Sequence, residues 1–221
     1  MQKKPHKKYN LLLFDLDGTL LDTAREFHIA LNRILEKEKK PHQSFENVRE
    51  RVSDGVGAMV SLGFGIDENN FDFEKKKEML YEAYSEVYLN SEPFDGVEEI
   101  IKIFIDKKIN WGIVTNKPKI FSAQIFKKLE WNKKANILVC PDDVNGIRKP
   151  DPASLIFALK SLKTEAKNTI YVGDNWRDIE AAKSSKITPI FAEYGYVKEI
   201  NFPSNDEGFN IKNINEVLSF I

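Results

Sequence analysis

The stretch LLLFDLDGTLLDT, residues 11–23, places four apolar residues directly before two aspartates that flank one leucine. Side chains two apart on an extended chain point to one side. A strand that buries Leu11 to Phe14 therefore carries Asp15 and Asp17 out of its C-terminal end, with both carboxylates facing the same cleft. The chain therefore has to fold around a buried strand with two charged carboxylates at its C-terminal end.

The hydrophobic pattern predicts only helices from residue 23 to 92. Phe27, Leu31 and Ile34 lie at helical spacing, and Thr23 with Glu26 forms a plausible capping box that starts this helix. From Pro93 onward strands and helices alternate, with a loop-rich segment at 198–212. The expected strands are NWGIVT, NILVC, TIYVG and ITPIFA, and the expected helices lie near 97–104, 118–129, 152–162, 177–185 and 213–220.

This alternation predicts an α/β fold, a parallel sheet covered by helices on both faces. The expected core comprises residues 1–22 and 93–221. The all-helical stretch 23–92 is then an insert that emerges after the first strand.

The amino-acid composition limits which binding partners and which cellular compartment we expect. The 221 residues carry 33 basic and 34 acidic side chains, so no global field favours nucleic acid or a membrane surface. The apolar run after the basic start ends at Phe14, too short for a signal peptide or a membrane span. The single cysteine, Cys140, fits a reducing compartment, and we expect a cytoplasmic protein.

Four polar clusters each follow a predicted strand. They are Asp15 with Asp17, Thr115 with Asn116, IRKPDP, and GDNWRD. In an open parallel sheet the strand C-termini line one edge, where ligands bind at the point at which the strand order reverses. We therefore expect these clusters to converge.

The four aspartates of these clusters would repel one another unless a cation held them. Oxygen donors without histidine or cysteine favour Mg²⁺ as the cofactor. The predicted metal site therefore comprises Asp15, Asp17, Asp174 and Asp178. GDNWRD taken alone is equally explained as an ordinary acidic first turn of a helix.

The remaining residues of these clusters predict a phosphoryl site. Lys149 supplies fixed positive charge, and Thr115 and Asn116 supply neutral donors to phosphoryl oxygens. Asp15 could attack phosphorus to form an aspartyl phosphate, while Asp17 protonates the leaving oxygen and then activates water. Asp151 with Pro152 is explained structurally, as the start of a helix.

In order and spacing, DLDGTLLD, VTN, RKPDP and GDNWRD resemble the four motifs of the haloacid dehalogenase-like hydrolases. The resemblance implies a Rossmann-like core, Mg²⁺ dependence, Asp15 as nucleophile and Asp17 as acid/base whose backbone carbonyl also binds the metal. It also implies Asp174 and Asp178 at the metal, and Gly18, Thr115, Asn116 and Lys149 around the phosphoryl group. The dehalogenases lack the second aspartate of the first motif, so Asp17 favours phosphate ester chemistry.

The helical insert resembles the cap of the phosphoglycolate phosphatase-like subfamily, which implies a domain that closes over the core and selects the substrate. RVSDGVGAMV resembles the substrate-facing loop of that cap, with Arg51, Gly55 and Gly57 as candidate substrate residues. A plain turn between helices explains this loop equally well. YGY at 194–196 is similar to sequences in phosphoglycolate and N-acetylmuramic acid 6-phosphate phosphatases.

Three functions remain open from the sequence. The leading hypothesis is a Mg²⁺-dependent phosphatase for a small phosphorylated metabolite, either phosphoglycolate-like or a sugar phosphate, acting as a monomer or homodimer without nucleic acid or membrane partners. A β-phosphoglucomutase-like phosphotransferase would use the same core with a cap that excludes water. A non-catalytic binding protein of the same fold is expected to have lost a core residue, and none is missing.

Overall fold

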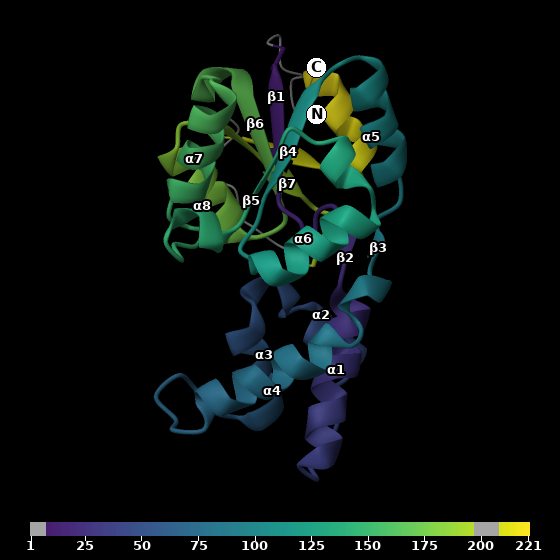
Figure 1. The fold of residues 1–221 in the computed structure, drawn as a ribbon, viewed down its shortest axis with the longest axis vertical. Helices are drawn as coiled ribbons and strands as arrows, with labels where there is room; N and C mark the ends of the chain where they lie inside the picture. Colours follow the sequence, from purple (N-terminus) through teal and green to yellow (C-terminus); the bar gives the residue numbers. More distant parts are fainter. Residues whose placement is uncertain (1–7, 197–207) are drawn as a thin grey trace.

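The computed structural model describes residues 8–196 and 208–221. Figure 1 shows two bodies, an α/β body that holds both ends of the chain and a helical body beneath it. Two short strands connect them, β2 (Leu21–Asp22) and β3 (Glu92–Pro93), which pair antiparallel. The chain thus enters and leaves the helical body side by side.

The α/β body contains a six-stranded parallel sheet in the order β5-β4-β1-β6-β7-β8. Numbered within this sheet alone, the order is 3-2-1-4-5-6, which is Rossmann-like. The central strand β1 is fully buried because LLLF is apolar on both faces. The strands are β1 (Leu11–Phe14), β4 (Asn110–Val114), β5 (Ile137–Val139), β6 (Thr169–Gly173), β7 (Thr188–Ala192) and β8 (Phe209–Ile211).

Helices cover both faces of this sheet, as the sequence predicts (Figure 1). One face packs against α5 (Val97–Asp106), α6 (Lys119–Lys128) and the 3₁₀ helix Ile214–Phe220. The other face packs against α7 (Ala153–Leu162) and α8 (Trp176–Ser184). Each face has its own apolar core, and the polar strand ends are left at the edge nearest the helical body.

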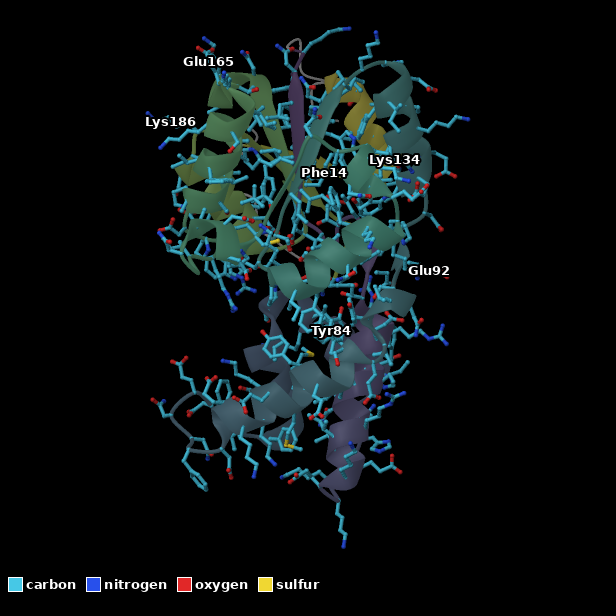
Figure 2. The ribbon with its side chains drawn as sticks, in the orientation of Figure 1. Phe14, Tyr84, Glu92, Lys134, Glu165 and Lys186 are labelled. Atoms are coloured by element: carbon cyan, nitrogen blue, oxygen red, sulfur yellow. The ribbon has the colours of Figure 1, made fainter. Side chains whose placement is uncertain are left out.

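The helical body has a third apolar core of its own. Its helices are α1 (Ala24–Lys37), α2 (Phe45–Arg49), α3 (Val56–Phe64) and α4 (Phe73–Ser85). Buried Phe27, Leu31 and Ile34 on α1 face Leu80 and Tyr84 on α4. In Figure 2 Tyr84 lies at the end of this body that faces the sheet, whereas Phe14 lies within the α/β body.

Several local predictions need correction. The first helix begins where expected, but Thr23 makes no side-chain cap; instead, the Tyr196 hydroxyl accepts hydrogen bonds from the backbone N–H groups of Thr23 and Ala24. Within the segment predicted as loop, residues 198–207 lie outside the described residues, and Phe209–Ile211 forms the edge strand β8. The terminal helix forms where expected, as the 3₁₀ helix Ile214–Phe220.

None of the helices in the described ranges combines the length and the apolar character needed to cross a bilayer.

Candidate active site

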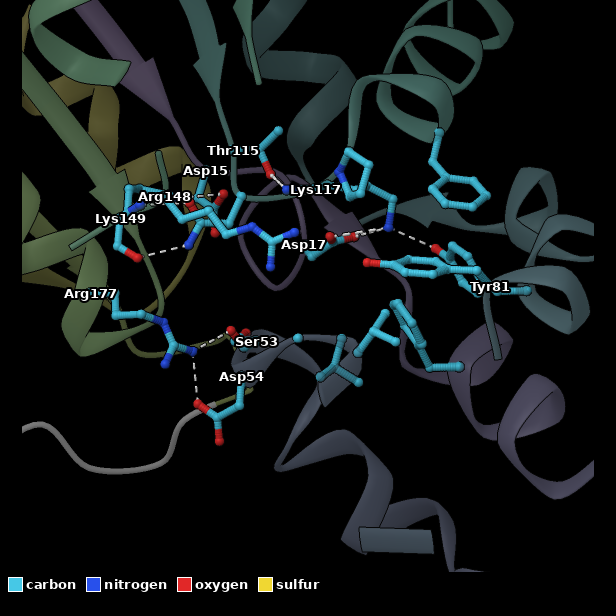
Figure 3. Close-up of a pocket in the computed structure, with 18 residues that line it drawn as sticks. Asp15, Asp17, Ser53, Asp54, Tyr81, Thr115, Lys117, Arg148, Lys149 and Arg177 are labelled. Atoms are coloured by element: carbon cyan, nitrogen blue, oxygen red, sulfur yellow. Dashed lines mark hydrogen bonds and ion pairs between the residues drawn. The ribbon is translucent and has the colours of Figure 1, made fainter. Parts of the chain in front are cut away.

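Six of the predicted residues line a cavity of about 250 Å³ between the carboxyl edge of the sheet and the helical body (Figure 3), namely Asp15, Asp17, Gly55, Thr115, Asn116 and Lys149. Asp15 follows β1, Thr115 follows β4, and Lys149 lies on the loop before α7. The helical body supplies Phe27, Tyr81, Tyr84 and the loop of residues 52–56. The cavity therefore needs both bodies for its walls.

Three carboxylates gather behind this cavity. One oxygen each of Asp15, Asp174 and Asp178 lies within 4.8 Å of the others, and all three residues are buried. Asp178 also accepts a hydrogen bond from the Asn175 backbone N–H (3.0 Å) and completes a capping box at the start of α8. The helix-start explanation of GDNWRD is thus correct, and it coexists with the acidic cluster.

Burial and the neighbouring carboxylates of Asp178 and Asp15 raise the pKa of Asp174 to about 8. Burial likewise raises the pKa of Asp178 to about 6, even though Lys149 acts in the opposite direction. The Asp174 Oδ1 atom is buried and has no hydrogen-bond partner among the described residues. A set of oxygen donors with unmet negative charge fits a hard divalent cation.

Lys149 is the buried cation of this cluster. Its Nζ lies 2.8 Å from Asp15 Oδ1 and 2.6 Å from Asp178 Oδ1, and it donates to the Tyr171 hydroxyl at 2.7 Å. Burial opposes the charge of Lys149, but the two carboxylates outweigh it and hold its pKa above the usual value. Tyr171 in turn donates to the Val114 carbonyl (2.7 Å), which fixes the network to β4.

Asp17 lies outside the three-carboxylate cluster, although it lines the same cavity. Lys117 Nζ donates to both Asp17 oxygens at 3.1 and 3.2 Å and to the Tyr84 hydroxyl at 2.8 Å. Lys117 is buried and lies over the rings of Phe27 and Tyr84. One lysine therefore connects the predicted acid/base carboxyl to the helical body.

Asn116 has a structural contact that the sequence did not predict. Its side chain accepts from the Lys149 backbone N–H (2.8 Å) and donates to the Lys149 carbonyl (3.0 Å). Thr115 Oγ1 accepts from the Lys117 backbone N–H at 3.1 Å. The two Asn116 bonds hold the loops after β4 and before α7 against each other, while the Thr115 bond lies within the loop after β4.

Two glycines allow the backbone to pass close to Asp174. A Cβ on Gly18 would lie 2.3 Å from Asp174 Oδ2, and Gly18 has a φ of +81°. A Cβ on Gly195 would lie 2.3 Å from Asp174 Cβ and 2.6 Å from the Gly18 carbonyl oxygen. Neither position has room for a side chain. The short distances to Asp174 also show that Gly18 lies beside the acidic cluster.

Of the three predicted substrate residues in the helical body, Gly55 lines the cavity, while the lining among the described residues includes neither Arg51 nor Gly57. The Arg51 side chain is 60% exposed and lies 3.6 Å from Asp54. Gly57 faces Phe73 within the helical body. The same loop instead places Ser53 at the site, where its Oγ donates to Asp174 Oδ2 at 2.9 Å.

Sequence reasoning missed several residues that contact the site. Lys117, Arg148 and Arg177 line the cavity, and Tyr171 and Tyr196 hold its residues from behind. Lys117 and Arg148 directly adjoin predicted site residues, which was an available signal. Tyr171 lies within strand β6, and nothing in the sequence except its hydroxyl group indicated that it contacts the site.

The chain is similar to known proteins over most of its length. The sequence model of the haloacid dehalogenase-like hydrolase family matches residues 12–192. The chain is 33% identical over 195 residues to the N-acetylmuramic acid 6-phosphate phosphatase of Pseudomonas aeruginosa, covering 88% of this chain and 86% of the relative. It is 33% identical over 185 residues to the phosphoglycolate phosphatase of Xanthomonas campestris pv. campestris, covering 84% and 83%.

The fold also resembles solved structures at low sequence identity. A haloacid dehalogenase-like family protein from Streptococcus pneumoniae superposes with a TM-score of 0.81 at 15% identity, covering 96% of this chain and 98% of that one. A HAD-superfamily hydrolase of subfamily IA from Geobacter sulfurreducens gives a TM-score of 0.72 at 16% identity, covering 96% of each chain. At such identity the likeness concerns the fold alone.

Proposed function

The chain belongs to the haloacid dehalogenase-like hydrolase family, as a phosphoric monoester hydrolase, and on that premise we propose that it hydrolyses a small sugar phosphate through an aspartyl phosphate on Asp15. The proposed cofactor is Mg²⁺, and the proposed cap is the helical body. The observation that carries the proposal is that buried carboxylates, a buried lysine and an aromatic wall meet at one small cavity.

The phosphoryl end of this cavity comprises Asp15, Thr115 and Lys149. In the proposed first step an Asp15 carboxylate oxygen forms a bond to phosphorus and the ester P–O bond breaks. The leaving oxygen keeps the electron pair and takes a proton from Asp17. In the second step Asp17 takes a proton from a water whose oxygen attacks phosphorus, which releases inorganic phosphate and restores Asp15.

The acidic cluster supports the proposed metal. Asp15, Asp174 and Asp178 would hold Mg²⁺, which when bound neutralises negative charge on the phosphoryl oxygens. Lys149 adds a second positive charge on the side of Asp15. Together these groups would offset the charge that otherwise keeps a phosphate away from three carboxylates.

The opposite wall of the cavity is aromatic. Phe27 and Tyr84 stack with centroids 4.1 Å apart, and Phe121 meets Tyr81 at 5.8 Å and Tyr84 at 5.3 Å. Phe27 and Tyr84 cover each other's faces, so the wall offers apolar ring surface, chiefly of the half-buried Tyr81, to the carbon skeleton of a substrate. The cavity of about 250 Å³ is below the range of roughly 300–1,000 Å³ for drug-sized ligands, which favours a single monosaccharide phosphate or a smaller compound.

The test is phosphate release by the purified protein, with and without Mg²⁺. The panel comprises N-acetylmuramic acid 6-phosphate, N-acetylglucosamine 6-phosphate, glucose 6-phosphate, β-glucose 1-phosphate, 2-phosphoglycolate and a nucleoside monophosphate. We expect Mg²⁺-dependent release that is fastest from a sugar phosphate. Preference for 2-phosphoglycolate would agree with phosphatase activity but would refute a sugar phosphate as the substrate. Phosphoryl transfer to a second sugar hydroxyl without release of free phosphate would identify a mutase.

Asp15→Asn tests the covalent route in the same assay. Turnover is expected to fall by several orders of magnitude because the amide is a poor nucleophile, while the thermal unfolding curve shows a folded protein. Acid-quenched wild-type protein should gain the mass of one phosphoryl group during turnover, and the variant should not. Turnover by Asp15→Asn at a rate near wild type would rule out the aspartyl phosphate.

A further inference from the structure

The charges that line the cavity are almost completely paired. Lys149 forms an ion pair with Asp15, Lys117 forms one with Asp17, and Arg177 forms one with Asp54 at 2.9 Å. Arg148 is the remaining cationic residue of the lining, and its guanidinium has no ion pair with any carboxylate in residues 8–196 or 208–221. The described site thus contains one arginine whose charge the protein itself leaves unmatched.

Hydrogen bonds fix the backbone around Arg148, whereas its side chain is exposed to the cavity. The Arg148 carbonyl accepts from the Asp151 backbone N–H at 3.1 Å, and the next residue, Lys149, is clamped on both sides by Asn116. Figure 3 shows the Arg148 side chain extending from the Lys149 side into the pocket. Its guanidinium is therefore presented to the ligand from a fixed base beside the phosphoryl end.

We propose that Arg148 binds a carboxylate of the substrate, so that the preferred phosphomonoesters carry a carboxylate besides the phosphate. The inference rests on the proposed phosphatase function and names the substrate class of that same site. A guanidinium offers two parallel N–H donors that match the two oxygens of a carboxylate.

A carboxylate fits better than a second phosphate. One guanidinium without an ion pair balances the single negative charge of a carboxylate, whereas it balances only one of the two charges of a second phosphate dianion. The cavity volume also limits the size of any second group. Hydrolysis of a sugar bisphosphate in preference to carboxylate-bearing compounds would therefore overturn the inference.

The test uses two pairs of substrates that differ in the carboxylate. N-acetylmuramic acid 6-phosphate and N-acetylglucosamine 6-phosphate share ring, acetamido group and phosphate, and only the first carries a lactyl carboxylate. For a two-carbon substrate the pair is 2-phosphoglycolate and 2-hydroxyethyl phosphate. Wild type is expected to have a higher kcat/KM for the acid in whichever pair it hydrolyses.

Arg148→Gln is expected to reduce the ratio of kcat/KM for the acid over its neutral partner by about 10- to 100-fold, as for loss of one charge-assisted hydrogen-bonding group. Arg148→Lys keeps the charge but not the paired donors, and should give an intermediate ratio. The matched control is Arg25→Gln, an exposed arginine on α1 outside the cavity, which should leave both constants unchanged.

The outcomes separate this inference from the proposed function. If Arg148→Gln lowers kcat/KM for acid and neutral partner by the same factor, Arg148 acts on the phosphoryl group and the inference is wrong. Equal kcat/KM values of wild type for both members of a pair also refute it while the phosphatase function stands. Hydrolysis of neither pair by wild type would overturn this inference alone, whereas the absence of Mg²⁺-dependent phosphate release from the whole panel would remove the proposed function with it.

Discussion

Asp174 is the residue whose ionisation depends most clearly on its surroundings. Ser53 and the Tyr196 backbone N–H both donate to its Oδ2 atom, at 2.9 and 3.0 Å, whereas Oδ1 has no partner in the described chain. Burial and two neighbouring carboxylates nevertheless raise its pKa to about 8. Two hydrogen bonds do not compensate for the loss of water and the repulsion between like charges.

This raised pKa predicts how the metal-free protein responds to pH. Folded Asp174 keeps its proton up to about pH 8, whereas an unfolded chain releases it near pH ~4. The folded state therefore binds more protons in this window, and its free energy of unfolding falls as pH rises from about 4 to about 8. Thermal unfolding in the presence of a chelator should show a Tm that decreases across that range.

The stabilisation of the folded protein by Mg²⁺ should instead increase with pH, because Mg²⁺ binds the carboxylate and competes with the proton. The increase in Tm on adding Mg²⁺ is expected to be larger at about pH 8.5 than at about pH 6. Asp174→Asn, with an amide that does not titrate, is the control and should lose most of the Mg²⁺ effect at both values. An equal Mg²⁺ effect at the two pH values in wild type would contradict the assignment.

At the scale of elements, the start of α1 depends on the segment that follows β7. The Tyr196 hydroxyl accepts from the backbone N–H groups of Thr23 (2.6 Å) and Ala24 (3.1 Å) and donates to Asp22 Oδ1 (2.8 Å). Arg49 of α2 lies over the Tyr196 ring at 5.1 Å. The junction between β2 and α1, where the helical body begins, is thus held by a tyrosine of the α/β body.

Tyr196→Phe should destabilise this junction without changing the ring. The Thr23 N–H then has no acceptor in a buried position, which should lower the free energy of unfolding by about 1–3 kcal/mol. Urea denaturation followed by circular dichroism measures the change. The control is Tyr81→Phe, whose hydroxyl has no hydrogen-bond partner among the described residues; equal stability of the two variants would show that the Tyr196 hydroxyl does not hold the helix start.

At the scale of the whole molecule, polar contacts across the cavity hold the two bodies in their closed arrangement. Arg177 on α8 donates to the Ser53 carbonyl (2.6 Å) and to Asp54 Oδ1 (2.9 Å). On the far side, Lys117 reaches Tyr84. The cavity walls therefore exist only while the helical body is docked.

Arg177→Gln should weaken the docked arrangement. We expect a larger radius of gyration by small-angle X-ray scattering and a kcat/KM that falls by about 2- to 10-fold, the range for loss of one partly exposed ion pair and hydrogen bond. Arg33→Gln is the matched control, since the ion pair of Arg33 with Glu86 (2.8 Å) lies within the helical body. Unchanged scattering and kinetics for Arg177→Gln would show that this contact does not hold the bodies together.

The sequence alone determined five of the six strands of the sheet, the helix faces and the sheet edge at which the candidate site lies. LLLF, TIYVG and ITPIFA are apolar runs between polar segments, and period and burial are local properties of the chain. The convergence of Asp15, Thr115, Lys149 and Asp174 follows as well, because parallel strands end at one edge. The same local rules failed at Thr23, where the predicted capping box does not form.

Only the tertiary structure decided which side chains meet across that edge. Tyr196 lies 173 residues from Thr23, Lys117 lies 100 residues from Asp17, and Ser53 lies 121 residues from Asp174. No periodicity encodes such pairs, because each depends on how two separately packed bodies dock. Likewise, Phe209–Ile211 is too short to read as a strand and becomes β8 only because β7 offers a free edge. The unmatched charge of Arg148 appears only once every other cation in the cavity has found its carboxylate.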